Sequence, residues 1–110
     1  MEYPLLRTAI VLFYDKSQKV MIQDRREISK WGEEYSFFGG KCNHGEHPDE
    51  TLKREMMEEL ELDIKNQTLF RSYNIVNDEQ KLRVERNVYT ADIPDLSKIV
   101  CHEGKIKLTT

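Results

Sequence analysis

Apolar and polar residues are arranged in strand-like runs in the N-terminal part of the chain. Residues 8–14 are almost all apolar or β-branched, which predicts a buried strand. After a polar turn, residues 19–24 alternate between apolar and polar side chains, which predicts the second strand of a hairpin. A polar loop over 25–35 then leads to a short predicted strand at 36–38, which runs into a pair of glycines.

In one segment the apolar residues recur with the period of an α-helix. Leu52, Met56 and Leu60 recur at every fourth position, which predicts the buried stripe of an amphipathic helix that reaches about Leu60. Pro48 suits the first turn of this helix, because the backbone N–H that proline lacks has no intrahelical partner there.

The remaining chain again favours strands. Residues 68–76 and 81–91 predict two strands around a polar turn, and residues 99–101 and 106–108 are weaker strand candidates. The order of three strands, a helix and further strands predicts an α/β (α+β) fold in which a helix packs on a mixed sheet. With 110 residues, one domain spanning 1–110 is expected.

Composition and charge narrow the function classes. The formal net charge of −3 and the pI near 5.6 give no general attraction to nucleic-acid polymers or to an anionic membrane. No apolar run approaches the length of a membrane span, and the N-terminus lacks the pattern of a signal peptide. Cys42 and Cys101 are too few and too far apart for a secreted disulfide framework, so we expect free thiols in a reducing cytoplasm.

Residues 40–62 contain the densest group of chemically useful side chains. Glu55 lies three positions before Glu58 and four before Glu59, so the three carboxylates meet on the helix surface and repel one another. A cation would remove this repulsion, and Mg²⁺ prefers oxygen ligands of this kind. Taken alone, three glutamates at this spacing more often form a solvated acidic helix face.

The same stretch resembles the signature box of the Nudix hydrolases. That box reads Gly, five residues of any kind, Glu, seven of any kind, Arg-Glu, an apolar residue, one of any kind, Glu-Glu, one of any kind, Gly and an apolar residue. The matching residues are Gly40, Glu46, Arg54, Glu55, Met56, Glu58, Glu59 and Leu62. One position differs, since Glu61 stands where the box usually has glycine. A glutamate is strained in the left-handed conformation that glycine adopts at a helix end, so we expect the helix to run further and to end near Asn66.

The resemblance implies the α/β/α sandwich of the Nudix fold. Members usually carry a last strand and a second helix that covers the other sheet face, and this chain ends at Thr110, near where that helix would begin. We therefore expect a single Nudix domain that is short at its C-terminus, with the C-terminal helix missing or truncated. An uncovered sheet face would be an exposed apolar patch, which favours a homodimer.

The resemblance also implies an activity. Nudix enzymes hydrolyse a diphosphate bond in a nucleoside diphosphate linked to a moiety X, and the ion implied here is Mg²⁺, with Mn²⁺ as a substitute. A nucleoside triphosphate is the leading substrate, and a nucleoside monophosphate would be released. The alternative from another class is a catalytically inactive Nudix-like module that binds a nucleotide or a protein.

The resemblance assigns roles to the acidic residues of the box and to one acid outside it. The expected metal ligands are Gly40 through its carbonyl, Glu46, Glu55, Glu58, Glu59 and Glu103, the last from a late loop. Glu85 is a rival for this late acid, and Glu46 could instead steady the loop before the helix. Arg54 either pairs with Glu58 on the helix or holds a metal-binding glutamate in place. The general base is expected to be Glu58 or Glu59, with Glu103 as a further candidate.

Substrate contacts are sought near the box. Lys41 follows the two glycines and is a candidate phosphate contact, as is Arg25. Trp31 could stack on a nucleobase, as could Tyr35 and Phe37, although aromatic residues at such positions are more often part of a core.

Overall fold

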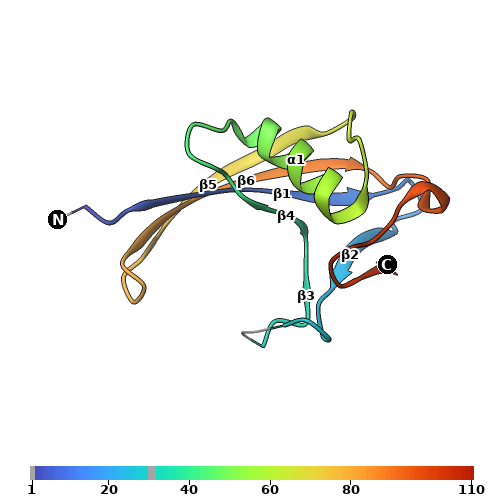
Figure 1. Cartoon of the computed structure of the whole chain (residues 1–110), viewed down its shortest axis with the longest axis horizontal. Helices are drawn as coiled ribbons and strands as arrows, with labels where there is room; N and C mark the ends of the chain where they lie inside the picture. Colours follow the sequence, from blue (N-terminus) through green and yellow to red (C-terminus); the bar gives the residue numbers. More distant parts are fainter. Residues whose placement is uncertain (1, 30–31) are drawn as a thin grey trace.

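The computed structural model describes residues 2–29 and 32–110 and places seven strands of this part in one sheet. The strands are β1 (Leu5–Tyr14), β2 (Val20–Asp24), β3 (Tyr35–Ser36), β4 (Phe38–Lys41), β5 (Thr68–Asn77), β6 (Leu82–Asp92) and β7 (Lys105–Thr109). One α-helix, α1 (Pro48–Leu60), and a short 3₁₀ helix, η1 (Leu96–Lys98), complete the described elements (Figure 1).

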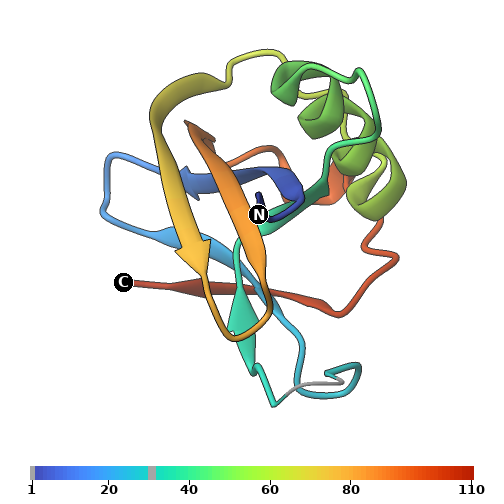
Figure 2. The same cartoon turned by 90° about the vertical axis from the view of Figure 1, so that its left-hand side faces the viewer.

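The strand β1 is the centre of the sheet. It pairs in parallel with β6 along its whole length, from Leu5 opposite Arg83 to Tyr14 opposite Asp92. On its other side it pairs antiparallel with β4 and, near its end, with β2. The sheet is therefore mixed, as expected, with the order β3-β2-β1-β6-β5, while β7 pairs with β2 (Figure 2).

Both predicted hairpins are confirmed, since β1 pairs with β2 and β5 pairs with β6. The weak candidate at 106–108 lies within β7, whereas the candidate at 99–101 is wrong because these residues form no strand. Instead the N–H groups of Val100 and His102 bond to carbonyls at the end of α1. The last carbonyls of a helix lack intrahelical partners, so this segment completes the helix end rather than the sheet.

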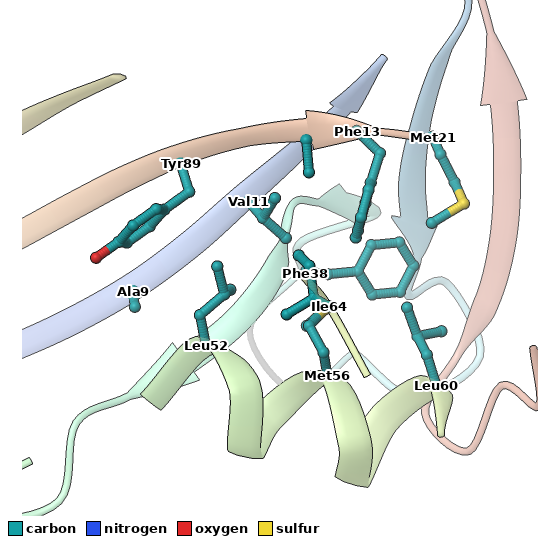
Figure 3. Close-up of a cluster of buried hydrophobic side chains, with 11 residues drawn as sticks. Ala9, Val11, Phe13, Met21, Phe38, Leu52, Met56, Leu60, Ile64 and Tyr89 are labelled. Atoms are coloured by element: carbon teal, nitrogen blue, oxygen red, sulfur yellow. The ribbon is translucent and has the colours of Figure 1, made fainter. Parts of the chain in front are cut away.

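The core lies between α1 and one face of the sheet. The predicted stripe of Leu52, Met56 and Leu60 is fully buried and faces side chains of β1 and β4 (Figure 3). Phe13 and Phe38 meet edge to face there, with ring centroids 6.1 Å apart. Each such buried side chain contributes about 1.5–3 kcal/mol through removal from water. The burial of Leu52, Met56 and Leu60 therefore holds α1 on the sheet.

The beginning of α1 follows the prediction, and its end does not. Pro48 is the first helical residue, and His47 caps the helix by accepting a bond from the Asp49 N–H. The helix ends at Leu60, because Glu61 takes the left-handed conformation with φ of 52°. The expected extension to Asn66 is therefore wrong.

Backbone bonds at the end of α1 account for the conformation of Glu61. Its N–H group bonds to the Met57 carbonyl, and the N–H of Leu62 bonds to the Met56 carbonyl at 3.1 Å. The chain must reverse at Glu61 to make the second of these bonds. The bonds offset the cost of about 1 kcal/mol that a β-carbon carries in this conformation.

The sheet face opposite α1 carries no α-helix among the described residues, where α1 is the one α-helix. A hollow of about 530 Å³ lies on this face; its apolar lining includes Ile10, Leu12, Phe70, Tyr73, Ile75 and Val88. Every residue of β5 except Asn77 is exposed. In the part of the chain that the structure describes, no helix has the length and apolar character needed to cross a membrane.

Candidate active site

The helix α1 presents three glutamates in very different surroundings. Glu59 is buried, with 6% of its surface exposed, whereas the side chain of Glu58 is 59% exposed. Glu55 lies between these extremes and faces β4. The packing of α1 on the sheet therefore places one carboxylate inside the molecule and one at its surface.

Arg54 contacts three acidic residues, one in the loop before α1 and two on the helix. Its Nε and one terminal nitrogen donate to the two oxygens of Glu46, both at 2.9 Å, and its other terminal nitrogen donates to Glu55 at 2.8 Å. It also donates to the backbone carbonyl of Lys41 at 3.0 Å and lies 3.6 Å from Glu58. Both predicted roles of Arg54 are thus compatible with the geometry, and the contact with Glu55 is the shorter one.

Both carboxylate oxygens of Glu46 accept hydrogen bonds from other residues of the chain. Besides Arg54, the Thr51 hydroxyl donates to it at 2.7 Å and the Asn43 N–H donates at 3.0 Å. The Arg54 guanidinium, followed by these two donors, lowers the pKa of Glu46 to about 2. Of the two roles expected for Glu46, this geometry favours the steadying of the loop before α1.

The glycine pair brings β4 close to β1 and to the acids. Gly39 has φ of +141°, and a β-carbon there would lie 2.1 Å from the Ala9 carbonyl oxygen. On Gly40 a β-carbon would lie 2.6 Å from a carboxylate oxygen of Glu55. Any side chain at Gly40 would therefore displace Glu55.

Glu59 is the most perturbed acid of the site. Burial, followed by the carboxylates of Glu103 and Glu55, raises its pKa to about 9. Its Oε2 atom is buried and has no hydrogen-bond partner within residues 2–29 and 32–110. A buried carboxylate oxygen without a partner is costly, so this atom is suited to receive a ligand of positive charge.

Glu103 joins the site from the loop between η1 and β7. The Gln23 amide donates to its backbone carbonyl at 2.8 Å, and Arg25 lies 3.5 Å from its carboxylate. Glu85, the rival for this position, instead accepts from Arg7 at 2.7 Å and from Asn87 at 3.2 Å. The loop therefore brings Glu103, and not Glu85, beside Glu59.

The carboxylates of the site are the kind of oxygen ligands that a hard cation prefers, and two of them are paired with Arg54. Among the described residues, no three His, Cys, Asp or Glu side chains already have the arrangement of a metal site. One reason is that Arg54 holds Glu46 and Glu55 to itself. The partnerless oxygen of Glu59, with two further carboxylates close by, nevertheless gives the all-oxygen surroundings that Mg²⁺ and Mn²⁺ prefer.

The residues predicted to contact the substrate lie in different surroundings. Arg25 lies beside Glu103 and also donates to Gln23 at 2.9 Å, while Lys41 is exposed at the end of β4. The prediction for Trp31 lies outside the described residues.

A groove on the open face adjoins the glycine pair. It measures about 500 Å³, and its lining includes Tyr35 and Phe37 together with Gly39, Gly40 and Arg86. Sequence reasoning passed over Arg86. The alternation along β6 could have revealed it, because Arg86 shares a strand face with the apolar Val84 and Val88.

Comparison with known proteins agrees with the fold. A model of the NUDIX domain matches residues 4–98, and the chain belongs to this family. Members generally hydrolyse nucleoside diphosphates linked to another moiety, and the chain is a pyrophosphohydrolase of this type. A search of curated proteins finds no match.

Solved structures share the fold at low sequence identity. A MutT protein from Methanosarcina mazei Go1 is 18% identical, with a TM-score of 0.72 over 99% of this chain and 78% of that one. A MutT NUDIX hydrolase from Burkholderia pseudomallei is 16% identical, with a TM-score of 0.74 over 94% of this chain and 81% of that one. The E. coli dihydroneopterin triphosphate pyrophosphohydrolase is 16% identical, with a TM-score of 0.66 over 97% of this chain and 82% of that one.

Proposed function

We propose that this chain hydrolyses a diphosphate bond of a nucleoside triphosphate or a related nucleotide in a Mg²⁺-dependent reaction that releases a nucleoside monophosphate. The observation that carries the proposal is Glu59, a buried carboxylate with a partnerless oxygen beside Glu55 and Glu103. Mn²⁺ has similar ligand preferences and is proposed as a substitute.

The proposed ligands of the ion come from three elements. They are Glu55, Glu58 and Glu59 of α1, Glu103 of the late loop and the carbonyl of Gly40, while Glu46 acts indirectly through Arg54. When bound, the ion supplies positive charge to phosphate oxygens and lowers the pKa of the attacking water. Arg54 keeps the Glu55 carboxylate turned toward Gly40 through its bond of 2.8 Å.

The chain's own residues would handle the proton and the phosphates. Glu59 is the first candidate for general base, because a bound cation would favour the charged form of its buried carboxylate, and only that form can accept a proton. Glu58 and Glu103 are the alternatives. Arg25 and Lys41 would contact phosphate oxygens, since Arg25 lies 3.5 Å from Glu103 and Lys41 is exposed and directly follows Gly40 in β4.

The groove beside the glycine pair is the proposed place for the base of the nucleotide. Tyr35 and Phe37 could stack on a base, and Arg86 adds hydrogen-bond donors. Trp31 is retained as a further stacking candidate.

The test is release of phosphate and pyrophosphate from a panel of nucleotides with Mg²⁺, with Mn²⁺ and with EDTA. We expect Glu59→Gln to lose at least about 100-fold in turnover, the scale of a lost acid–base group. Glu79→Gln is the matched control, because Glu79 lies exposed in the turn between β5 and β6. Equal turnover of Glu59→Gln and the parent chain would contradict the proposal.

A binding module is the second candidate, because Arg54 pairs with the carboxylates of Glu46 and Glu55 and so competes with an ion for them. It predicts saturable nucleotide binding by calorimetry and no product after long incubation with Mg²⁺. Product formation that depends on Glu59 excludes it.

We further propose that two copies cover the open sheet face. The strand β5 is the edge of the described sheet, and its exposed apolar side chains on this face include Phe70, Tyr73 and Ile75. Analytical ultracentrifugation should give a dimer mass that Phe70→Asp reduces to the monomer. A monomer at all concentrations of the parent chain would refute this proposal.

The free thiols of Cys42 and Cys101 support the proposed cytoplasmic location.

A further inference from the structure

The loop that carries Glu103 is bound to the end of α1 through its backbone. The N–H of Val100 donates to the Leu60 carbonyl at 3.1 Å, and the N–H of His102 donates to the Glu59 carbonyl at 2.7 Å. Both carbonyls belong to the last turn of the helix, where intrahelical partners are missing. The loop and the helix residue Glu59 therefore move together.

A pair of side chains closes the same junction. The Nε2 atom of His102 lies 2.5 Å from Oε2 of Glu61, and each side chain is about half exposed (52% and 51%). Exposed pairs of this kind add little to global stability. Their effect is local, because His102 directly precedes Glu103 and Glu61 is two residues beyond Glu59.

Glu61 occupies a position at which its backbone is unfavourable. Its φ of 52° is one that glycine adopts readily and that a residue with a β-carbon resists. The box usually has glycine here, so this chain has exchanged a relaxed residue for one whose side chain reaches His102. The unfavourable backbone conformation of Glu61 is explained if its side chain has a function at this position.

The other side of the loop is held by β2. Gln23 donates to the Glu103 carbonyl at 2.8 Å, and Arg25 lies 3.5 Å from the Glu103 carboxylate. Within the loop, the Cys101 thiol also donates to the Glu103 carbonyl at 3.4 Å, so neither of these contacts ties Glu103 to α1.

We propose that Glu61 and His102 form a positioning pair that holds the 99–103 loop, and with it Glu103, against Glu59. The inference rests on the proposed function for its catalytic meaning, but the holding of the loop is a separate physical claim. Glu61 and His102 touch neither substrate nor ion; they act through Glu103.

The experiment compares Glu61→Gly, His102→Ala and His102→Gln in the full chain. Glu61→Gly removes the pair and also relieves the positive φ, so its melting temperature should stay level or rise. The exchange of the Val100 and His102 amide hydrogens with solvent should nevertheless become faster. His102→Gln, which keeps a donor, should retain part of the protection. Glu27→Ala is the matched control, because it removes the exposed pair of Glu27 with Lys105 at 3.0 Å.

Mn²⁺ binding gives the second readout through a double-mutant cycle with Glu103→Gln. Glu61→Gly should weaken Mn²⁺ binding by about tenfold when Glu103 is present, which is the scale of an outer-shell contact. It should have little effect when Glu103 is replaced. An equal effect in both backgrounds, or unchanged amide exchange in Glu61→Gly, would overturn the proposal.

The failure of the two proposals can be told apart. A parent chain that binds no Mn²⁺ and hydrolyses no nucleotide refutes the proposed function. Amide exchange still decides on the pair in that case: protection that depends on Glu61 supports it, and protection independent of Glu61 overturns it.

Discussion

The carboxylate of Glu55 fills the space that a β-carbon on Gly40 would need, with its Cδ atom 2.5 Å from that position. The glycine of the box thus has a steric reason that is independent of any ligand. The backbone of β4 and the side chain of Glu55 are packed as one unit.

Gly40→Ala should therefore displace Glu55 and impair metal binding more than folding. We expect a loss of about tenfold to 100-fold in Mn²⁺ affinity, measured by titration, because a ligand is moved rather than removed. Combining the substitution with Glu55→Gln should add little further loss. Fully additive losses would show that Gly40 acts through something other than Glu55.

Arg54→Ala should destabilise the protein, because it leaves the two oxygens of Glu46 without their charged donor. Hydrogen bonds to charged groups contribute about 1.5–3 kcal/mol, and a loss of this size in the free energy of unfolding is expected in urea titrations. Arg54→Lys should recover only part of it, since an ammonium group cannot form the two-pronged contact. Full recovery by lysine would mean that charge alone is needed.

Stability of the metal-free protein should fall as pH rises from about 5 to about 9. The pKa of Glu59 in the folded state is raised to about 9 from its usual 4.5, so folding favours the protonated form. Its contribution is present below the unfolded pKa and is lost as pH rises through the folded pKa. Urea unfolding in EDTA at several pH values measures this.

Glu59→Gln supplies the control for the pH series, because an amide cannot titrate and the fall should flatten. Adding Mg²⁺ should also flatten it, since a cation favours the charged carboxylate. A pH profile that is the same for Glu59→Gln and the parent chain would refute the assignment.

Glu103→Gln and Glu85→Gln should separate a metal-site acid from a structural one. The first should lower Mn²⁺ affinity by about tenfold or more and leave the melting temperature nearly unchanged. The second should leave Mn²⁺ binding intact and lower stability, since Arg7 then loses its charged partner at 2.7 Å. The reverse pattern would restore Glu85 as the late acid.

Local sequence patterns predicted most of the fold. The alternation in β2 and the helical stripe of Leu52, Met56 and Leu60 reflect burial against a single neighbour, which periodicity reports directly. The end of α1 was mispredicted because a local penalty at Glu61 is outweighed by backbone bonds, among them those that the Val100 and His102 N–H groups make to the last turn of the helix. Such terms depend on residues about 40 positions apart and leave no periodic trace.

The candidate site was predictable only in part. The box gave the glutamates of α1, but nothing in their spacing separates the buried Glu59 from the exposed Glu58. That difference comes from which helix face meets the sheet and where the late loop docks. Residues 99–101 read as a strand because they are partly apolar, although the Val100 N–H bonds to the Leu60 carbonyl at the end of α1 and the Ile99 N–H bonds to the Leu96 carbonyl.

The parallel pairing of β1 with β6 has a consequence for how the molecule assembles. Leu5 faces Arg83, and every pair along these strands spans the same separation of 78 positions. Contacts this distant in sequence carry a large loop-closure entropy and slow the folding of a chain. During synthesis the box would leave the ribosome well before β6 exists, so the acidic cluster would acquire its buried surroundings only as the last third of the chain arrives.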